Sequence, residues 1–394
     1  MTITKALLIG LVIIIGVIIL VPFFLRFATL PSGGGFLSSG SQGGSGREIL
    51  ISVDEGENWQ EANKAEAKRE RFPSRIHGLF FHPKESRTVY LGSESAGLWK
   101  SDNGGKSWRR VTDKNKFLKN NSTIYKLAIS RSDPKIMYAA VVQDNRGRVL
   151  RSQDGGESFQ EIYFINVLRT PVFDVSVDSV NPNKVLIATG QGGILETQNG
   201  GRTWRVKKWF GYPVQKLIGN NQSYFENYLI TGQNQFLKTF DGGEEWEDFT
   251  ENIRKAWINT QTATSQDPGN VFAVPDYLRP VGSNFQLALK TLTTDPNIFS
   301  VLYLGLPNAL LRSYNGGVSW SGVATPIPPR ESPITSVALS PRGSNIIFVG
   351  TGNQIYKSVD NGVNWKIINL STKRKVRNIY INPLRPNDIF AVLQ

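Results

Sequence analysis

The sequence predicts an all-β fold, a seven-bladed β-propeller preceded by one transmembrane helix. Two observations predict the propeller: an eight-residue motif occurs seven times, and short strand-like segments surround each copy. A third observation predicts the helix, because residues 6–25 contain no charged side chain. The 394 residues are 40% apolar and have a mean hydropathy of −0.24, which is typical of a chain with a folded body.

The repeated motif has Ser or Thr first, Asp or Asn third, Gly fifth and an aromatic residue eighth. Its copies start 42 to 51 residues apart, except for one interval of 74 residues. Seven matches at one rough period indicate a repeat architecture. The copies begin at Ser52, Ser101, Ser152, Thr197, Thr239, Ser313 and Ser358.

Each copy is typical of a stapled hairpin turn. The third residue can accept hydrogen bonds from the turn's own backbone, and the fifth glycine can adopt the positive φ that tight turns need. The eighth residue buries a ring that anchors the turn. Because three of the seven third residues are Asn, we expect them to be structural and not catalytic. The third and eighth residues are Asp54 and Trp59, Asn103 and Trp108, Asp154 and Phe159, Asn199 and Trp204, Asp241 and Trp246, Asn315 and Trp320, and Asp360 and Trp365.

Four strands in a unit of about 40 residues are the pattern of a propeller blade. The C-terminal residues 376–394 supply two strands and residues 48–62 supply two more, so we expect them to form one closing blade. Such Velcro closure pairs the two ends and removes the exposed sheet edges. The six complete units cover residues 76–112, 124–163, 172–209, 214–250, 285–323 and 334–369.

Two segments do not follow the blade pattern. Residues 60–70 (QEANKAEAKRE) are rich in helix formers and predict a short charged helix after the closing blade. Residues 251–284 form a long inter-blade insertion, which is either a functional loop on a rigid scaffold or a plain surface excursion.

The N-terminus predicts an uncleaved signal anchor. Residues 1–5 form a short n-region, residues 6–27 the transmembrane anchor, and residues 28–47 a Gly/Ser-rich flexible linker to the propeller at 48–394. Twenty uncharged residues rise about 30 Å, the thickness of a bilayer's hydrocarbon core. The apolar stretch is longer than that of a cleaved signal, and Lys5 before it favours a propeller on the extracytoplasmic side. We therefore expect a single-pass membrane protein.

Composition restricts the partners and cofactors. A net charge of +13 attracts an anionic membrane surface or an acidic protein segment. Nucleic acid is not an expected partner, because the one dense basic cluster, at 373–377, belongs to no nucleic-acid motif. The chain has no cysteine and therefore no disulfide or thiolate metal site. We expect no cofactor and no metal, because His77 and His82 are five positions apart on one strand and would point to opposite faces.

The motif resembles the Asp-box (BNR) repeat, S-x-D-x-G-x-x-W, and the resemblance covers residues 48–394. Sialidases, two-propeller xyloglucanases, sortilin-type receptor domains and photosystem II assembly/stability factors share this repeat. The architecture is most similar to the last group, which are single seven-bladed propellers with Velcro closure and a basic patch. That resemblance implies a membrane-side assembly factor without catalysis. Asp boxes are structural in all of these families, so the boxes do not choose among them.

A glycoside hydrolase is the alternative. The sialidase resemblance would require a Phe/Tyr-Arg-Ile/Leu-Pro motif near the first blade, and the strings FPSRI (72–76) and YLRP (277–280) match it neither in order nor in place. Glycosidases generally need two carboxylates about 5–9.5 Å apart. The sequence places no two of its candidates together: Asp174, Glu226, Asp276 and Glu331.

The expected binding surface is the propeller face opposite the repeated turns. That face collects the links between blades and the loops between second and third strands. Its arginines can clamp carboxylates bidentately, so we expect it to bind an acidic segment of a protein partner or an anionic headgroup. The simpler alternative is a set of unrelated, solvated arginines. The candidate residues are Arg75, Arg169, Tyr277, Arg279, Arg330, Arg374 and Arg377.

These features together predict a membrane-anchored, non-catalytic scaffold that aids the assembly or stability of membrane or envelope proteins. An extracytoplasmic propeller that binds or hydrolyses glycans is the alternative. The two differ at the centre of the ring, where an enzyme needs paired carboxylates with aromatic walls and a scaffold needs a broad basic surface.

Overall fold

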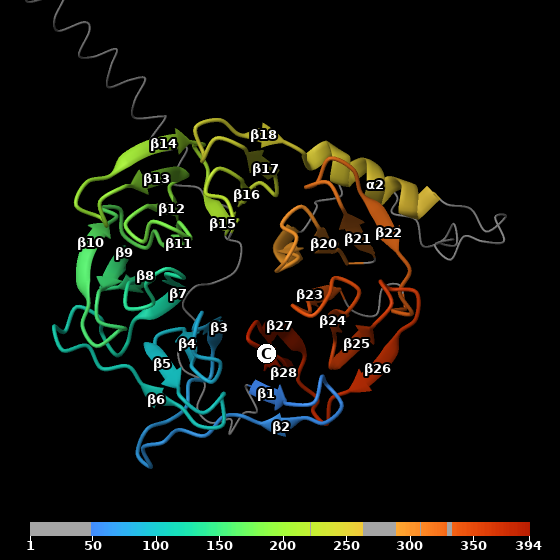
Figure 1. Ribbon diagram of the computed structural model, residues 1–394, viewed down its shortest axis with the longest axis horizontal. Coiled ribbons are helices and arrows are strands. Elements are labelled where there is room, and N and C mark those ends of the chain that lie inside the picture. Colours follow the sequence, from blue (N-terminus) through green and yellow to red (C-terminus); the bar gives the residue numbers. More distant parts are fainter. Residues whose placement is uncertain (1–48, 221, 263–288, 308, 329–332) are drawn as a thin grey trace, which may run out of the picture. The chain divides into compact units, whose positions relative to one another are not determined.

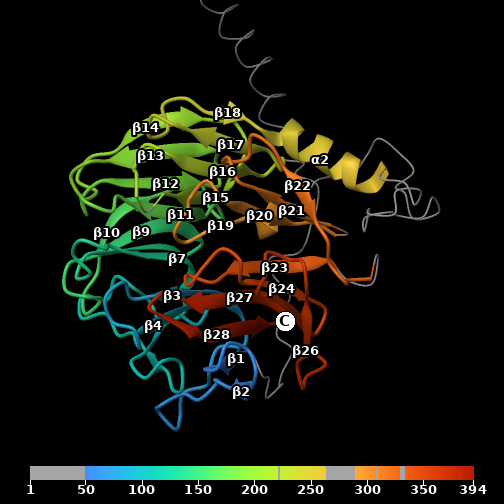
Figure 2. The same cartoon turned by 45° about the vertical axis from the view of Figure 1, so that its right-hand side comes forward.

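The described part of the chain folds into a ring of seven four-stranded antiparallel sheets in the computed structural model (Figures 1 and 2). The prediction of an all-β, seven-bladed propeller is therefore confirmed. The structure describes residues 49–220, 222–262, 289–307, 309–328 and 333–394.

The expected anchor (6–27) and linker (28–47) lie outside the described residues. Within the described ranges, no helix combines the length and the apolar character that a membrane crossing requires.

The blades are numbered along the chain, and the strands of each run from the centre of the ring to its rim (Figure 1). Blade 1 contains β3 (Ile76–Phe81), β4 (Val89–Ser93), β5 (Leu98–Ser101) and β6 (Arg109–Arg110). Blade 2 contains β7 (Thr123–Ile129), β8 (Met137–Gln143), β9 (Arg146–Ser152) and β10 (Gln160–Phe164). Blade 3 contains β11 (Val172–Val177), β12 (Val185–Thr189), β13 (Gly193–Thr197) and β14 (Arg205–Trp209). Blade 4 contains β15 (Val214–Gly219), β16 (Asn227–Thr231), β17 (Phe236–Thr239) and β18 (Glu247–Asp248).

The second half of the ring includes the blade built from both ends of the described chain. Blade 5 contains β19 (Thr293–Thr294), β20 (Leu302–Gly305), β21 (Leu310–Ser313) and β22 (Ser321–Val323). Blade 6 contains β23 (Ile334–Leu339), β24 (Ile347–Thr351), β25 (Gln354–Ser358) and β26 (Lys366–Asn369). Blade 7 contains β27 (Val376–Asn382), β28 (Arg385–Leu393), β1 (Ile49–Ser52) and β2 (Gln60–Glu61).

The hydrophobic core lies between neighbouring sheets. Tyr90 and Leu98 of blade 1, for example, pack with Ile124, Leu127 and Leu150 of blade 2. Central strands such as β4, β12 and β24 are buried along their whole length. They read as continuous apolar runs because both of their faces are covered.

The closing blade joins β1 to β28 in the sheet order β2-β1-β28-β27, which is the arrangement that we predicted. Ile49 pairs with Val392 and Ser52 with Ile389. The fully buried ring of Phe390 packs in one cluster with Ile51 and with residues of blade 1. Blade 7 therefore completes the ring with a continuous backbone ladder.

The repeated motif forms the same hydrogen-bonded turn in every blade, and we call it the repeat turn. The fifth-position N–H donates to the first-position hydroxyl at 2.7–2.9 Å. That hydroxyl donates to the third-position side chain at 2.7–3.0 Å. The third side chain also accepts the N–H of the seventh residue at 2.8–3.1 Å. At Asp54, hydrogen bonds led by the Asn58 N–H lower the pKa of the carboxyl to about 2.

The fourth position of the repeat turn has a second role. In six blades its N–H donates to a carbonyl on the turn between the first and second strands of the same blade, and in blade 7 it donates to Asn387 near the start of β28, at 2.8–3.1 Å. Its φ lies between +61° and +76°, which favours glycine. The two turns at this end of each sheet are thereby joined. The fourth residues are Glu55, Gly104, Gly155, Gly200, Gly242, Gly316 and Asn361.

The eighth residue ties several blades to the preceding one. The indole N–H of Trp204 donates to the Ile162 carbonyl at 3.0 Å, and that of Trp365 donates to the Ala324 carbonyl at 2.8 Å. The fully buried Trp108 donates in the same way to Ala62 at 2.8 Å.

The expected helix at 60–70 is wrong. After β2 the chain is extended, and it passes along Trp108 of blade 1. The Trp108 N–H donates to the Lys64 carbonyl at 2.9 Å, and the Glu66 N–H donates to the Trp108 carbonyl at 2.8 Å. Backbone pairing with blade 1 outweighs the helix propensity of this segment.

The start of the predicted insertion is helical. Helix α2 (Thr250–Thr262) buries Ile253, Ala256 and Trp257 against the core between blades 4 and 5. The 3-10 helix η2 (Leu289–Thr291) leads into β19. Residues 263–288 of the insertion lie outside the described residues.

The closing blade predicts a large cost for Phe390→Ala. Removing this ring leaves a cavity between blades 7 and 1, so we expect a loss of about 3–5 kcal/mol in the free energy of unfolding. The exposed Leu384 on the turn before β28 is a matched control, and Leu384→Ala should cost less than about 0.5 kcal/mol. Chemical denaturation followed by tryptophan fluorescence measures both. Equal losses would contradict this account of the closure.

The geometry of the repeat turn predicts which of two glycine substitutions lowers the free energy of unfolding more. A Cβ at Gly155 would meet no heavy atom within 4 Å, so Gly155→Ala should cost about 1–2 kcal/mol from its positive φ alone. A Cβ at Gly317 would clash with the Phe236 ring, so Gly317→Ala should cost more because that ring must also move. Denaturation midpoints of the two variants decide the order, and the reverse order would disprove it.

Candidate functional site: a cationic and aromatic cavity at the centre of the ring

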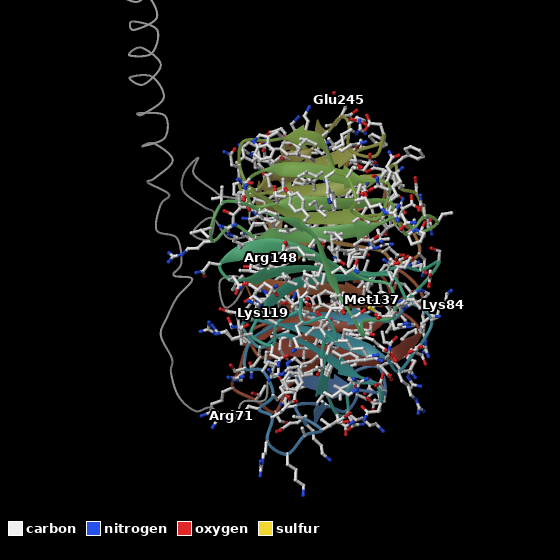
Figure 3. All side chains as sticks on the ribbon, turned by 90° about the vertical axis from the view of Figure 1, so that its left-hand side faces the viewer. Arg71, Lys84, Lys119, Met137, Arg148 and Glu245 are labelled. Atoms are coloured by element: carbon white, nitrogen blue, oxygen red, sulfur yellow. The ribbon has the colours of Figure 1, made fainter. Side chains whose placement is uncertain are left out.

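The ring has two faces. The repeat-turn face carries the repeat turns and the turns between first and second strands, such as the turn with Lys84. The link face carries the links between blades, such as that with Lys119. Figure 3 shows the ring edge-on, with Lys84 on one side and Lys119 and Arg71 on the other. The inner strands begin at the link face.

A cavity of about 800 Å³ lies where the inner strands begin. Residues from blades 1 to 7 line it, with η2 and β20 contributing for blade 5. Its lining combines cations, aromatic rings and short polar side chains. Such concave sites with a few convergent polar groups are the usual places where proteins bind ligands.

A β-bulge lies at the same place in six inner strands, and in five of them two successive residues line this cavity, while in blade 6 Thr335 does. In blade 1, Ile76 pairs with Ser93 and Gly78 with Gly92, so His77 has no partner in the ladder. The extra residue lets Ile76 and Leu79 both enter the interblade core, while His77 and Gly78 line the cavity. The equivalent bulge segments are 76–79, 124–127, 172–175, 214–217, 334–337 and 376–379.

Among the described residues, three cations line the cavity, and two of them donate to backbone carbonyls. Lys216 Nζ donates to the Leu292 carbonyl at 2.7 Å, and Arg377 Nη1 donates to the Ile76 carbonyl at 3.1 Å. Lys126 Nζ pairs with Asp174 Oδ1 at 3.2 Å. Burial, and then the charge of Lys126, lower the pKa of Lys216 to about 8, although Asp174 opposes the shift.

An aromatic wall runs through blades 1, 2 and 3. The rings of His77 and Tyr125 lie 4.8 Å apart and are tilted by 36°. Tyr125 and Phe173 meet edge to face at 5.5 Å. Burial and then Arg377 lower the pKa of His77, so this ring is neutral at pH 7 and belongs to the apolar part of the lining.

The two described candidates for the carboxylates of a hydrolase, Asp174 and Glu226, lie at different faces of the ring, and each already has a cationic partner. Asp174 Oδ1 accepts the Val175 N–H and the Lys126 ammonium, and its Oδ2 accepts the Leu217 N–H at 3.2 Å. Glu226 lies on the turn between β15 and β16, at the repeat-turn face, where it pairs with Lys238 at 2.7 Å. Asp276 and Glu331 lie outside the described residues.

The structure places four candidate arginines at the link face, where the inner strands begin. Arg377 lines the cavity, and Arg75, one residue before β3, pairs with Glu94 at 3.1 Å. Arg169 is exposed on the link before β11, where its N–H donates to Asn145 at 2.6 Å. Arg374 is partly buried two residues before β27. Tyr277, Arg279 and Arg330 lie outside the described residues.

The two histidines lie at opposite ends of β3. His77 lines the cavity, whereas His82 follows the strand on the repeat-turn side. The Nδ1 atom of His82 accepts the N–H groups of Lys84 and Glu85 at 3.3 and 2.9 Å. His82 therefore stabilises the turn that follows β3.

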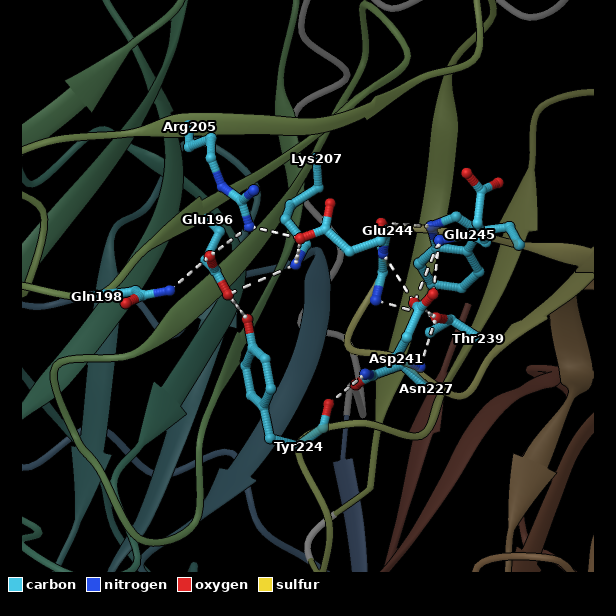
Figure 4. A network of polar contacts seen from close by, with 12 residues as sticks. Glu196, Gln198, Arg205, Lys207, Tyr224, Asn227, Thr239, Asp241, Glu244 and Glu245 are labelled. Atoms are coloured by element: carbon cyan, nitrogen blue, oxygen red, sulfur yellow. Dashed lines mark hydrogen bonds and ion pairs between the residues drawn. The ribbon is translucent and has the colours of Figure 1, made fainter.

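A second cluster of titratable groups joins blades 3 and 4 (Figure 4). The buried Glu196 accepts the Tyr224 hydroxyl at 2.5 Å and pairs with Arg205 at 3.2 Å. Arg205 and Lys207 each also reach Glu244, at 2.6 Å. Burial alone would raise the pKa of Glu196, but the Tyr224 hydrogen bond and the neighbouring cations outweigh it and lower this pKa. Since its charges are matched internally, the cluster fixes the blade interface.

Sequence reasoning missed Lys126, Lys216, Tyr125 and Phe173 as site residues. The signal that could have found them is a second repeat, an apolar pair three residues apart that encloses two variable residues at the start of each inner strand. Both ends of every bulge segment are buried. In a regular strand the first and fourth residues of this segment would point to opposite faces. The apolar pair therefore predicts a common buried face only if a bulge lies between its two members.

Comparisons with known proteins give the same architecture. No protein-family model matches the chain. A curated xyloglucanase from Paenibacillus sp. is 24% identical over 281 residues, which are 70% of this chain and 23% of that protein. The crystal structure of a GH74 xyloglucanase from Xanthomonas campestris matches with a TM-score of 0.60 and 15% identity, over 81% of this chain and 51% of that one.

YCF48 from Cyanidioschyzon merolae matches with a TM-score of 0.58 and 14% identity, over 81% of this chain and 95% of that one. A structure of YCF48 bound to D1 peptide matches with a TM-score of 0.57 and 14% identity, over 81% and 93%. The chain shares their propeller fold. It spans about a quarter of the curated xyloglucanase and about half of the Xanthomonas enzyme, but nearly all of YCF48 has a counterpart.

The ion pair beside Lys216 predicts the direction in which its pKa moves. Asp174 raises the pKa of Lys216, so Asp174→Asn should lower it below about 8. Unfolded Lys216 keeps its proton up to about 10.4, and the unfolded state therefore binds more protons than the folded state between these two values. Its contribution to stability rises with pH across this window, and Lys216→Met should remove that rise.

NMR titration of the Lys216 side chain in the wild type and in Asp174→Asn measures the shift. Urea unfolding of the wild type and Lys216→Met across the same pH range measures the linkage. A higher Lys216 pKa in Asp174→Asn would show that the assigned electrostatic arrangement is wrong.

Proposed function

We propose that this chain is a membrane-anchored, non-catalytic scaffold that binds a segment of a protein partner at the cavity and the link face around it. In this role it aids the assembly or stability of membrane proteins, with the propeller on the extracytoplasmic side. The proposal also takes the repeat turns to be Asp boxes with a structural role.

The chemistry of the cavity carries this proposal. Lys216 and Arg377 present positive charge beside an aromatic wall, and the one carboxylate side chain of the described lining, Asp174, is occupied by Lys126 and two backbone N–H groups. Arg75, Arg169 and Arg374 extend the positive charge onto the link face. A basic, partly apolar recess of this kind suits an acidic peptide segment.

The share of each similar protein that this chain matches supports the same function. Both YCF48 structures are matched over more than nine-tenths of their length, and one of them is bound to a peptide. The xyloglucanases extend well beyond the matched part. The uncharged stretch at residues 6–25 supports the membrane anchor.

A glycan-binding or glycoside-hydrolysing propeller is the second candidate. The aromatic wall favours it, because rings such as Tyr125 and Phe173 can pack against the faces of sugars. The curated relative is a xyloglucanase. A hydrolase would need a second carboxylate near Asp174, so xyloglucan hydrolysis that is lost in Asp174→Asn would favour this candidate.

Photo-crosslinking tests the scaffold proposal with matched positions. A photoreactive residue replaces Gln215, an exposed glutamine of the cavity, or Gln153, an exposed glutamine of a repeat turn, in the full chain in its own membranes. We expect a discrete adduct with one membrane protein from position 215 and none from 153. The level of that protein should fall when the chain is deleted. No adduct at 215, or the same adducts at both positions, would refute a partner site at the cavity.

A further inference from the structure

Three charged side chains stand next to one another in blades 2, 3 and 4. Lys126, Asp174 and Lys216 occupy the same bulge position on β7, β11 and β15, and all three line the cavity. Asp174 pairs with Lys126 at 3.2 Å and accepts the N–H of Leu217, the residue after Lys216. Their bulge positions therefore place a single anion between two cations.

The charge of this trio is +1, because two lysines face one carboxylate. Lys126 is compensated by Asp174, whereas Lys216 has the Leu292 carbonyl as its partner and no carboxylate within ion-pair distance among the described residues. A carboxylate is a monoanion and would bring the sum to zero. A phosphate dianion would leave excess negative charge beside Asp174, at a cost in a partly buried site.

The aromatic wall lies one residue away along the same strands. Tyr125 precedes Lys126, Phe173 precedes Asp174, and the two rings are in edge-to-face contact at 5.5 Å. A group held at Lys216 therefore has an apolar surface beside it. This arrangement fits a ligand with a carboxylate at one end and a ring or branched apolar group next to it.

We propose that Lys216 is the receptor for a carboxylate, with the attached apolar ring packed on Tyr125 and Phe173. The inference rests on the proposed function, because it makes this cavity the point where the partner's acidic segment is anchored. The carboxylate comes either from an Asp or Glu side chain or from the end of a chain. Both sources present the same chemistry to Lys216.

The titration of the cavity supports this site. The ammonium of Lys216 is largely charged at pH 7 and loses its proton as the pH passes about 8. The other titratable side chains that line the cavity are His77, Tyr125, Lys126, Asp174, Arg377 and Tyr380. Burial lowers the pKa of His77 and raises that of Tyr125, and it raises the pKa of Tyr380 to about 12. These three side chains therefore stay neutral between pH 7 and about 9.5.

Calorimetric titration of the full chain in detergent tests the proposal with four small probes. Hydrocinnamate carries a carboxylate and a ring, hydrocinnamamide has no charge, acetate has no ring, and phenyl phosphate is a dianion. We expect hydrocinnamate to bind at least about tenfold more tightly than the other three. Its affinity should fall by at least about tenfold between about pH 7 and about pH 9.5, because Lys216 must be protonated.

Lys216→Met removes the charge and keeps most of the length of the side chain. Its matched control is Lys84→Met, since Lys84 also donates to a carbonyl of the next blade, Ser132 at 3.1 Å, but on the repeat-turn face. We expect Lys216→Met to weaken hydrocinnamate at least about tenfold and Lys84→Met to leave it unchanged. Lys216→Arg should retain binding and lose the fall above pH 8. The wild-type pH profile keeps the test valid if Lys216→Met does not fold.

Two peptides distinguish the source of the carboxylate. One ends in Phe with a free carboxylate, and the other carries Glu beside Phe within a chain whose end is amidated. The peptide that binds more tightly to the wild type than to Lys216→Met identifies the source.

Equal binding of hydrocinnamate to the wild type and Lys216→Met, or equal binding of the acid and the amide, would overturn the inference. If the crosslink from position 215 still forms in that case, the proposed function stands and the partner is held by the link face alone. If the crosslink is absent while hydrocinnamate binds through Lys216, the proposed function fails and the site is one for a small carboxylate.

Discussion

Each sheet of this ring has two apolar faces and can bury them only against its neighbours. Central strands such as β12 and β16 are buried along their whole length, and the core clusters combine residues of adjacent blades. No blade can therefore retain its core by itself. The indole of Trp108, the cluster around Glu196 and the pairing of β1 with β28 all act at these interfaces.

The same constraint divides each four-residue bulge segment into residues that pack in the core and residues that belong to the candidate site. The ends of each bulge segment are buried, and in five of the six segments the two residues between them line the cavity. In blade 3 these inner residues are Phe173 and Asp174, and in blade 4 they are Gln215 and Lys216. The chemistry of the cavity can thus vary from blade to blade at constant packing. The bulge is the device that makes this division, because an unbroken strand would alternate between the two environments.

Most of the fold follows from local pattern. The blade expected at 124–163 is observed at 123–164, because turn chemistry and apolar runs both act over a few residues. The helix expected at 60–70 fails for the opposite reason, since that segment is shaped by backbone contacts with Trp108 from another blade. The spacing of Ile253, Ala256 and Trp257 is typical of a helix with one buried face, and it distinguishes α2 from the rest of the insertion.

The candidate site was less predictable than the fold. The topology places Arg75, Arg169, Arg374 and Arg377 at the end where the inner strands begin. The lysines of the cavity were not expected, because a lysine within a strand ordinarily reads as facing solvent. Only the position of the bulge shows that Lys126 and Lys216 face the centre of the ring. Whether a cation has a carboxylate partner depends on distant segments, which no local pattern contains.

The pairing of β1 with β28 also determines when the ring can close during synthesis. Residues 49–52 meet 389–392, so the first strand of the body waits while more than 300 further residues are synthesised. At about 5–20 residues per second, that wait is on the order of 20 to 70 seconds. During this time β1 is an apolar strand without its partner, the kind of edge that attracts other strands. The ring is thus most exposed to misassembly just before it closes.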